Sequence, residues 1–172
     1  MKKLNRKGFT LIELLAVIVI LAIIIALVFP QIMNVIDDSK ISTMHSNAKG
    51  IEKWWETTIS ADEISTGDKQ IPAGLANSIT TSWKCMNSIT STDGQTFWSV
   101  AKLADSDYVV SGNEPVDGQD ITKDTCSAVR YSNGGLEVLL VAKEGGKNYI
   151  AGSNATYAFS TASGGNINPY KN

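Results

Sequence analysis

The chain has 172 residues, enough for one domain of ordinary size plus a long additional element, and too few for a large multidomain enzyme. Its 43% hydrophobic and 19% charged residues exclude both a disordered chain and a polytopic membrane protein. The net charge of −2 is unevenly distributed, because four of the 15 basic residues lie in the first eight, MKKLNRKG, which leaves 11 against 17 acids. An acidic body excludes a general nucleic-acid coat protein, since a phosphate backbone requires clustered Lys and Arg.

The segment from Phe9 to Phe29 is apolar except for Thr10 and Glu13. As a helix, these residues would rise about 31 Å, close to the roughly 30 Å hydrocarbon core of a bilayer. A soluble surface helix would show a polar face over this length, and none exists from Leu14 onward. The preceding positive charges favour a cytoplasmic N-terminus with the following residues outside. The segment is therefore predicted to be embedded in a membrane.

Two ordinary interpretations explain this segment incompletely. A cleaved secretory signal requires small residues after the apolar core, which here ends in the bulky run Leu27-Val28-Phe29-Pro30. A plain membrane anchor fits the length but does not explain Glu13, because a carboxylate deep in a membrane helix costs about 2.5–3.5 kcal/mol. Unless Glu13 lies shallow enough to reach headgroups and water, it requires a partner.

Gly8 followed by FTLIELLAVIVILAIIIALVFP resembles the class III signal of type IV pilins and the related pseudopilins. The resemblance implies that a prepilin peptidase cuts between Gly8 and Phe9 on the cytoplasmic side, and that Phe9 becomes the N-methylated N-terminus. It also implies that Glu13, the fifth residue of the mature chain, acts in assembly. Pro30 matches a proline that many family members carry in the same helix.

Physical chemistry indicates why assembly would need Glu13. Helices that leave lipid and pack together exchange one apolar environment for another, so a polar contact has to supply the specificity. The Glu13 carboxylate could pair with the positively charged N-terminus of Phe9 in a neighbouring subunit, because a charge left alone there would be strongly unfavourable. At Pro30 a helix break or kink is expected, since proline lacks an N–H and its ring clashes with the preceding turn.

Beyond Pro30 the apolar residues recur at helical spacing in one stripe as far as about Ser60. The stripe comprises Ile32, Val35, Ile36, Met44, Ala48, Ile51, Trp55 and Thr58 or Ile59. Residues 9–30 are apolar on all sides and require lipid or a helical bundle around them. Residues 31–60 are apolar on one face and require a domain packed against that face.

With a leader at residues 1–8 and a globular head at 61–172, the prediction is an α+β fold. In it a long N-terminal α-helix, with a membrane or filament half and an amphipathic half, packs on a small antiparallel β-sheet head, which is the lollipop architecture of pilins.

Within the head, polar residues predict a long irregular connection over residues 60–96. A short helix is expected within residues 96–108, with Val100, Leu103 and Ala104 inward, and this element resembles the one that precedes the sheet in pilins of Gram-positive bacteria.

Short apolar runs separated by turn residues then indicate an antiparallel meander. The expected strands are Ser127–Tyr131, Leu136–Ala142 and Asn148–Ala151, with Thr156–Ser160 as a candidate fourth strand. The tail from Thr161 is expected to be a surface loop.

The two cysteines, Cys85 and Cys126, both lie on the predicted exported side. An even count in that compartment favours a single disulfide, with two free thiols as the alternative. Closing a loop of this length would stabilise the head by about 4 kcal/mol in the chain-entropy interpretation.

The remaining conspicuous residues are assigned structural roles. His45, the only histidine, has no Cys or second His spaced to share a metal with it. The four tryptophans are expected to anchor the core in preference to forming a carbohydrate-binding surface. Three acids near Gly118 match no calcium-binding loop pattern and are interpreted as a solvated acidic loop: Asp117, Asp120 and Asp124. No cofactor, metal or catalytic set is predicted.

The sequence therefore predicts a structural protein and not an enzyme. The resemblance implies a precursor in the cytoplasmic (inner) membrane, with its leader in the cytoplasm and its head outside, and then a cell-surface pilus for adhesion, aggregation or twitching motility. The implied partners are other pilin subunits in a helical homopolymer, the prepilin peptidase, an assembly machinery with separate ATPases, and the membrane; nucleic acid is not among them. Two alternatives stay open: a pseudopilin of a type II secretion or competence (DNA uptake) system, and a single-pass anchored binding domain that does not polymerise.

Overall fold

The computed structural model describes residues 9–103, 108–117, 124–132, 134–144, 147–153 and 166–167. Several predicted features lie outside these residues: Gly8 with the rest of the leader, Ala104, Asp120 and the candidate strand Thr156–Ser160. The chain divides into two units, a first unit of Met1–Asp38 and a second unit of Ser39–Asn172. One long α-helix, α1 (Leu11–Ile64), contributes residues to both.

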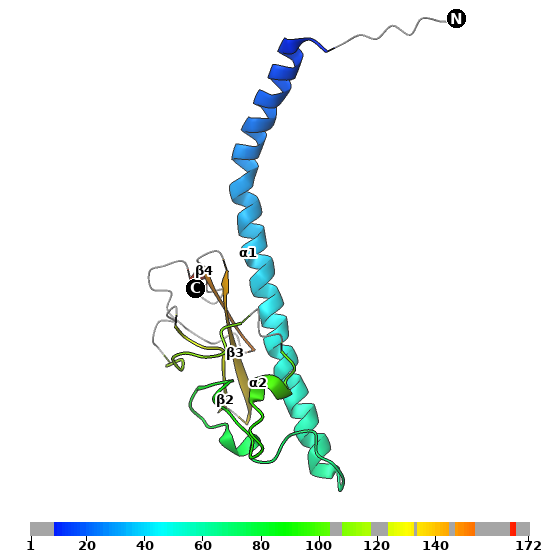
Figure 1. Ribbon diagram of the computed structural model, residues 1–172, viewed down its shortest axis with the longest axis vertical. Helices are drawn as coiled ribbons and strands as arrows, with labels where there is room; N and C mark the ends of the chain where they lie inside the picture. The colour runs from blue at the N-terminus through cyan, green and yellow to red at the C-terminus, as the bar shows by residue number, and fades with distance from the viewer. Residues whose placement is uncertain are drawn as a thin grey trace, which may run out of the picture. The chain divides into compact units, whose positions relative to one another are not determined.

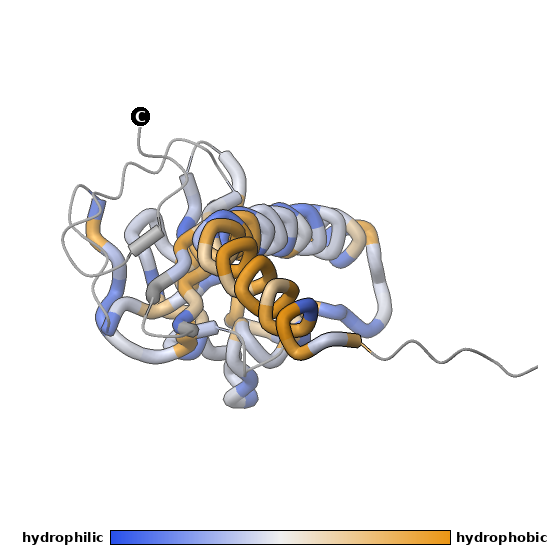
Figure 2. The backbone as a smooth tube through the Cα atoms, turned by 90° about the horizontal axis from the view of Figure 1, so that it is seen from above, coloured by the Kyte–Doolittle hydropathy of each residue, from blue (hydrophilic) through white to orange (hydrophobic). Residues whose placement is uncertain are grey.

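In the first unit, α1 is an apolar helix whose side chains are exposed as far as position 36. Every residue from 9 to 36 is exposed, and the backbone tube in Figure 2 carries the hydrophobic colour over most of this part of the helix. The most apolar 18-residue window has a mean hydropathy of 3.4, so the helix is long and apolar enough to cross a membrane. A helix that is apolar on all sides requires lipid or other helices around it.

The helix continues through Pro30, which corrects the break predicted there. Proline removes one hydrogen bond of the helical ladder, and the residues on both sides of it continue the helix. A local bend or melting at Pro30 in an assembled state stays a prediction.

In the second unit, the amphipathic half of α1 supplies one side of the hydrophobic core. The predicted stripe is confirmed by the buried side chains of Met44, Ala48, Ile51, Trp55 and Thr58. It begins at Ile41, whereas three residues that were predicted to belong to it are 50%, 66% and 53% exposed: Ile32, Val35 and Ile36. The helix ends at Ile64, slightly beyond the predicted end at Ser60.

The predicted meander is confirmed as the centre of a five-stranded sheet. The strands lie in sequence order across it: β1 (Lys84–Cys85), β2 (Ala128–Ser132), β3 (Gly135–Glu144), β4 (Lys147–Gly152) and β5 (Asn166–Ile167). The first four are antiparallel neighbours, with the register Val129↔Val138 between β2 and β3.

The edge strand β5 corrects two expectations. Residues 166–167 pair with β4 in parallel, so this part of the tail is not simply a surface loop and the sheet is not entirely antiparallel. A two-residue strand carries too little periodicity to be recognised without its partner.

The sheet is buried on both faces. Alternate residues of β2 and β3, among them Val129, Val138 and Leu140, belong to the same buried cluster as the α1 stripe. The residues between them, such as Leu139 and Val141, belong to a second cluster with Trp83 and both cysteines. Burial on both faces explains why β3 is a nearly continuous apolar run and not an alternating one.

Polar and aromatic contacts join α1 to the sheet within the second unit, where β3 lies beside the C-terminal half of the helix (Figure 1). The Trp55 indole Nε1–H donates to the Tyr131 hydroxyl at 2.8 Å. The Nδ1 atom of His45 lies 2.8 Å from the carbonyl oxygen of Gly152. His45 thus contacts the backbone at the end of β4.

The predicted short helix is present as α2 (Phe97–Val100), capped by the Thr96 hydroxyl, which accepts from the Ser99 N–H at 3.2 Å. Phe97 and Trp98 are buried, whereas Val100 and Leu103, expected to point inward, are only half-buried. The preceding irregular connection contains β1 and a single 3₁₀ turn, η1 (Ala76–Ser78). The expected role of the tryptophans as core anchors is confirmed for Trp55, Trp83 and Trp98, which are at most 4% exposed.

The predicted disulfide joins Cys85 in β1 to Cys126, two residues before β2. Both cysteines are buried and their Cα atoms are 5.6 Å apart. The bridge spans a sequence separation of 41 residues and holds the short strand β1 against β2.

Removing the bridge should lower the stability of the second unit. We expect the double variant Cys85→Ser/Cys126→Ser to lose about 4 kcal/mol in free energy of unfolding, because the unfolded chain regains the loop-closure entropy. Urea unfolding of the full chain in detergent, followed by tryptophan fluorescence, measures the change. Wild-type protein unfolded in the presence of a reductant should behave like the variant, and equal midpoints for oxidised wild type and the variant would contradict the prediction.

Candidate functional site

The first turn of α1 contains a reciprocal set of hydrogen bonds between Thr10 and Glu13. The Thr10 backbone N–H donates to Glu13 Oε2 at 2.7 Å, and the Thr10 hydroxyl donates to the same oxygen at 2.9 Å. The Glu13 backbone N–H donates back to Thr10 Oγ1 at 3.3 Å. The Leu14 N–H reaches the Thr10 carbonyl oxygen at 3.3 Å, which makes Thr10 the N-cap of the helix.

This arrangement is a capping box, in which an N-cap Thr and a Glu three residues later satisfy each other's backbone N–H groups. The first N–H groups of any helix lack partners within the helix, and the box satisfies two of them. The sequence interpretation gives Glu13 a role in assembly and does not predict its local role at the helix start. The spacing Thr-x-x-Glu before an apolar run was the signal that could have revealed it.

Phe9 directly precedes this turn and is 90% exposed. The structure therefore places Phe9 and Glu13, the predicted methylation and assembly residues, at the same end of α1. Gly8 lies outside the described residues, so the cleavage position stays a prediction.

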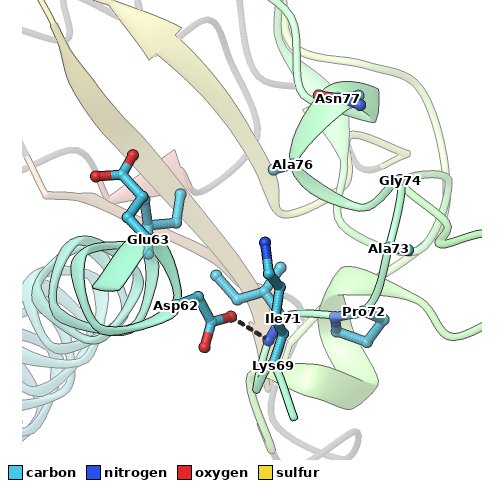
Figure 3. A pocket seen from close by; sticks show the side chains of 10 residues that line it. Asp62, Glu63, Lys69, Ile71, Pro72, Ala73, Gly74, Ala76 and Asn77 are labelled. Carbon is cyan, nitrogen blue, oxygen red and sulfur yellow. Dashed lines mark hydrogen bonds between the residues drawn. The ribbon is translucent and has the colours of Figure 1, made fainter. Parts of the chain in front are cut away.

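The second unit contains an open cavity of about 500 Å³ beside the end of α1, which the sequence did not predict (Figure 3). Its apolar lining comes from Ile59, Ile71, Pro72 and Ala76, and its polar lining includes Glu63, Lys69 and Asn77. Its lining residues include no hydroxyl, thiol or imidazole side chain. The cavity can hold an apolar group beside the charged side chains of Asp62, Glu63 and Lys69.

Asp62 connects the end of α1 to the segment that borders this cavity. Its two carboxylate oxygens accept from the backbone N–H groups of Gln70, at 2.9 Å, and Ile71, at 2.7 Å. These hydrogen bonds, that of Gln70 first, favour the charged form and hold the pKa of the buried Asp62 carboxyl below its usual value. Asp62 thus holds the backbone at Gln70 and Ile71 against the end of α1.

On the face of the sheet that carries Trp83, Arg130 contacts three side chains. Its Nε donates to Glu137 at 2.6 Å, its Nη1 pairs with Asp117, and its guanidinium lies 4.4 Å from the centre of the Trp83 ring. Trp83 Nε1 also donates to Asp117 at 2.9 Å.

Asp117 is 64% exposed, as expected for a residue of a solvated acidic loop, and it is in addition paired with Arg130 and bonded by Trp83. Burial raises the pKa of Asp117, but the hydrogen bonds from Trp83 and Arg130 and the charge of Arg130 outweigh it and lower the pKa. Within the described ranges, no three His, Cys, Asp or Glu side chains come together as a metal site.

Comparison with known proteins supports the assignment of the N-terminal segment. The pattern of the family described as "Prokaryotic N-terminal methylation motif" matches residues 3–29. The chain is 43% identical over 51 residues to the type II secretion system core protein G of Pseudomonas aeruginosa, a match that covers 30% of this chain and 36% of that protein. The chain thus matches little more than a third of this relative's length, and no solved structure matches it significantly. The predicted resemblance to the class III signal of pilins and pseudopilins is confirmed.

The Asp62 carboxylate should make stability depend on pH. Because its folded pKa is lowered, the stabilisation is present above the ordinary carboxyl pKa and is lost as the pH falls through the folded pKa. We expect Asp62→Asn to unfold at a lower temperature than wild type at pH 7, with the difference shrinking as the pH falls from about 5 to 3. Thermal unfolding across this range measures it. Asp68→Asn, at an exposed position, is the control, and a difference for Asp62→Asn that stays constant with pH would contradict the prediction.

Proposed function

We propose that this protein is a subunit of an extracellular filament of the type IV pilin class, made as a precursor, cut between Gly8 and Phe9, and polymerised through α1. The observation that carries the proposal is the methylation motif at residues 3–29, which leads directly into a helix with no buried residue as far as position 36. A packed second unit follows, with its own core. The protein acts as a structural subunit and not as an enzyme.

The position of the cut determines what the mature protein can do. Cleavage before the apolar run, and not after it, leaves the hydrophobic helix attached to the exported domain. Lipid then stores the subunits until their helices pack against one another, and this transfer changes the apolar environment little. The membrane is thus a reservoir and the filament the product.

Glu13 supplies the specificity of this transfer. Its carboxylate pairs with the ammonium group of Phe9 in a neighbouring subunit, because the helices offer few other polar groups near this end. A buried charge without a partner is strongly unfavourable, so the pairing also fixes the register between helices.

Processing and export require further partners. The motif at residues 3–29 supports a membrane-embedded prepilin peptidase that cuts and methylates the chain, followed by an assembly machinery with separate ATPases. The precursor lies in the cytoplasmic membrane with its leader inside, and the assembled protein lies on the cell surface.

The subunit could belong to either of two kinds of filament, a surface pilus or a secretion pseudopilus. Similarity to a type II secretion protein supports the pseudopilus, but it covers only 30% of the chain. The disulfide-bonded head supports a pilus used in adhesion, aggregation or twitching motility, because such a head is suited to an exposed and oxidising surface.

Mass spectrometry of material sheared from the cell surface tests the proposal. We expect chains that begin at N-methylated Phe9 in the sheared fraction, since cleavage after Gly8 precedes incorporation into a filament. Mature Phe9 chains confined to membranes would favour the pseudopilus, and an intact Met1–Gly8 leader in cells with active prepilin peptidase would contradict the proposal.

Removal of the carboxylate tests its role in assembly. We expect Glu13→Ala to be cleaved and inserted in the membrane as wild type is, but to give less than about a tenth of the wild-type filament, because a buried ion pair that loses one partner costs about 3–5 kcal/mol. Immunoblots of sheared and membrane fractions give both quantities. Normal filament yield from this variant would show that Glu13 does not act in assembly.

A further inference from the structure

We propose that Thr10 is the positioning residue for the Glu13 carboxylate: through the capping box it fixes one carboxylate oxygen within its own chain and leaves the other for the neighbouring subunit. This inference rests on the proposed function, in which Glu13 pairs with the N-terminus of Phe9. It assigns to Thr10 a role in assembly beyond capping its own helix.

The two oxygens of Glu13 are used differently. Both bonds from Thr10, at 2.7 Å from the backbone N–H and 2.9 Å from the hydroxyl, end on Oε2. Oε1 takes part in neither of them. Since each carboxylate oxygen can accept two hydrogen bonds, a second donor can approach Oε1 while the box stays intact.

A fixed side chain lowers the cost of association. A free Glu side chain samples several rotamers, and this freedom is lost when it is held by a partner. The capping box removes the freedom before two subunits meet, so less ordering remains to be done at assembly. The carboxylate is thereby presented at a defined position in the first turn of α1.

The box also makes the unassembled subunit compatible with a membrane. Within lipid neither the first N–H groups of a helix nor a carboxylate finds water. Thr10 and Glu13 satisfy each other's groups within one turn, at 2.7 to 3.3 Å. The same contact therefore serves the stored subunit and the assembled one.

The hydroxyl of Thr10 is the group that matters, because it both donates to the carboxylate and accepts from the Glu13 N–H. Valine has the same shape as threonine and can do neither. Serine can do both, and it is at least as good an N-cap residue as threonine. Valine and serine therefore separate hydrogen bonding from size at this position.

The experiment compares Thr10→Val and Thr10→Ser in the full chain in cells. The readout is the assembled fraction, defined as cleaved protein in sheared filaments divided by all cleaved protein, so that weaker cleavage does not count as weaker assembly. We expect Thr10→Val to be about fivefold lower than wild type, the factor typical for loss of an N-cap, and Thr10→Ser to be equal to wild type.

Thr43→Val is the matched control. The Thr43 hydroxyl also bonds within α1, donating to the Ser39 carbonyl oxygen at 2.9 Å, but it lies far along the chain from Glu13. The same loss of one hydroxyl should leave the assembled fraction unchanged there. A fall equal to that of Thr10→Val would overturn the inference, because any hydroxyl of the helix would then matter equally.

A second measurement does not depend on cleavage or assembly. Amide hydrogen exchange on the purified full chain in detergent micelles should show faster exchange at Glu13 in Thr10→Val than in wild type and Thr10→Ser. Unchanged exchange, a wild-type assembled fraction for Thr10→Val, or a defect in Thr10→Ser as large as that in Thr10→Val would each overturn the inference. Wild-type protein that keeps its Met1–Gly8 leader in cells with active prepilin peptidase would refute the proposed function itself, while the exchange measurement would still report on the box.

Discussion

Glu13 is the only charged residue from position 9 to position 36, and its carboxylate has to be satisfied in whatever environment the apolar half of α1 occupies. Lipid offers it no water, and in the proposed filament the core offers none either, so Glu13 would need hydrogen-bond donors in both environments. In the structure, the donors come from its own chain, through the backbone N–H and hydroxyl of Thr10. The apolar residues that follow provide the affinity for lipid or for other helices, but they cannot choose between neighbours. Under the proposed function, the choice depends on the Glu13 carboxylate and on the turn that holds it.

The second unit is shaped by the need to cover both faces of its sheet. Its central strand β3 is buried on both sides, so the sheet requires a cover on each face. The stripe of α1 from Ile41 to Thr58 covers one face. Trp83 and the disulfide lie on the other, where Arg130 is stacked on Trp83 and paired with Glu137. The same helix therefore contributes an unpartnered apolar surface in the first unit and a core in the second.

The elements that could be predicted from the sequence are those long enough to show a regular spacing of apolar residues. The helix and the three long strands follow from apolar spacing, and the disulfide follows from an even cysteine count in a domain predicted to be exported. The strands β1 and β5 have two residues each and exist only through pairing with distant segments, such as Lys84 with Val129. The carboxylate of Asp62 bonds backbone N–H groups eight and nine residues later, and side-chain identity carries no sign of that. The capping box is visible in the sequence as Thr-x-x-Glu, but a carboxylate in an apolar run points to a partner outside the chain as readily as to one within the first turn.

The disulfide has a mechanical consequence for a filament under tension. Because Cys85 and Cys126 are covalently joined, the residues between them cannot add to the length of a stretched subunit. At about 3.3–3.6 Å per extended residue, this withholds roughly 140 Å of contour length. Pulling could separate β1 from β2 only as far as the bridge allows, because Cys85 is the last residue of β1 and Cys126 lies two residues before β2. The segment from residue 86 to 125, including α2 and its buried Phe97, would stay a closed loop even in a subunit whose sheet had been pulled apart.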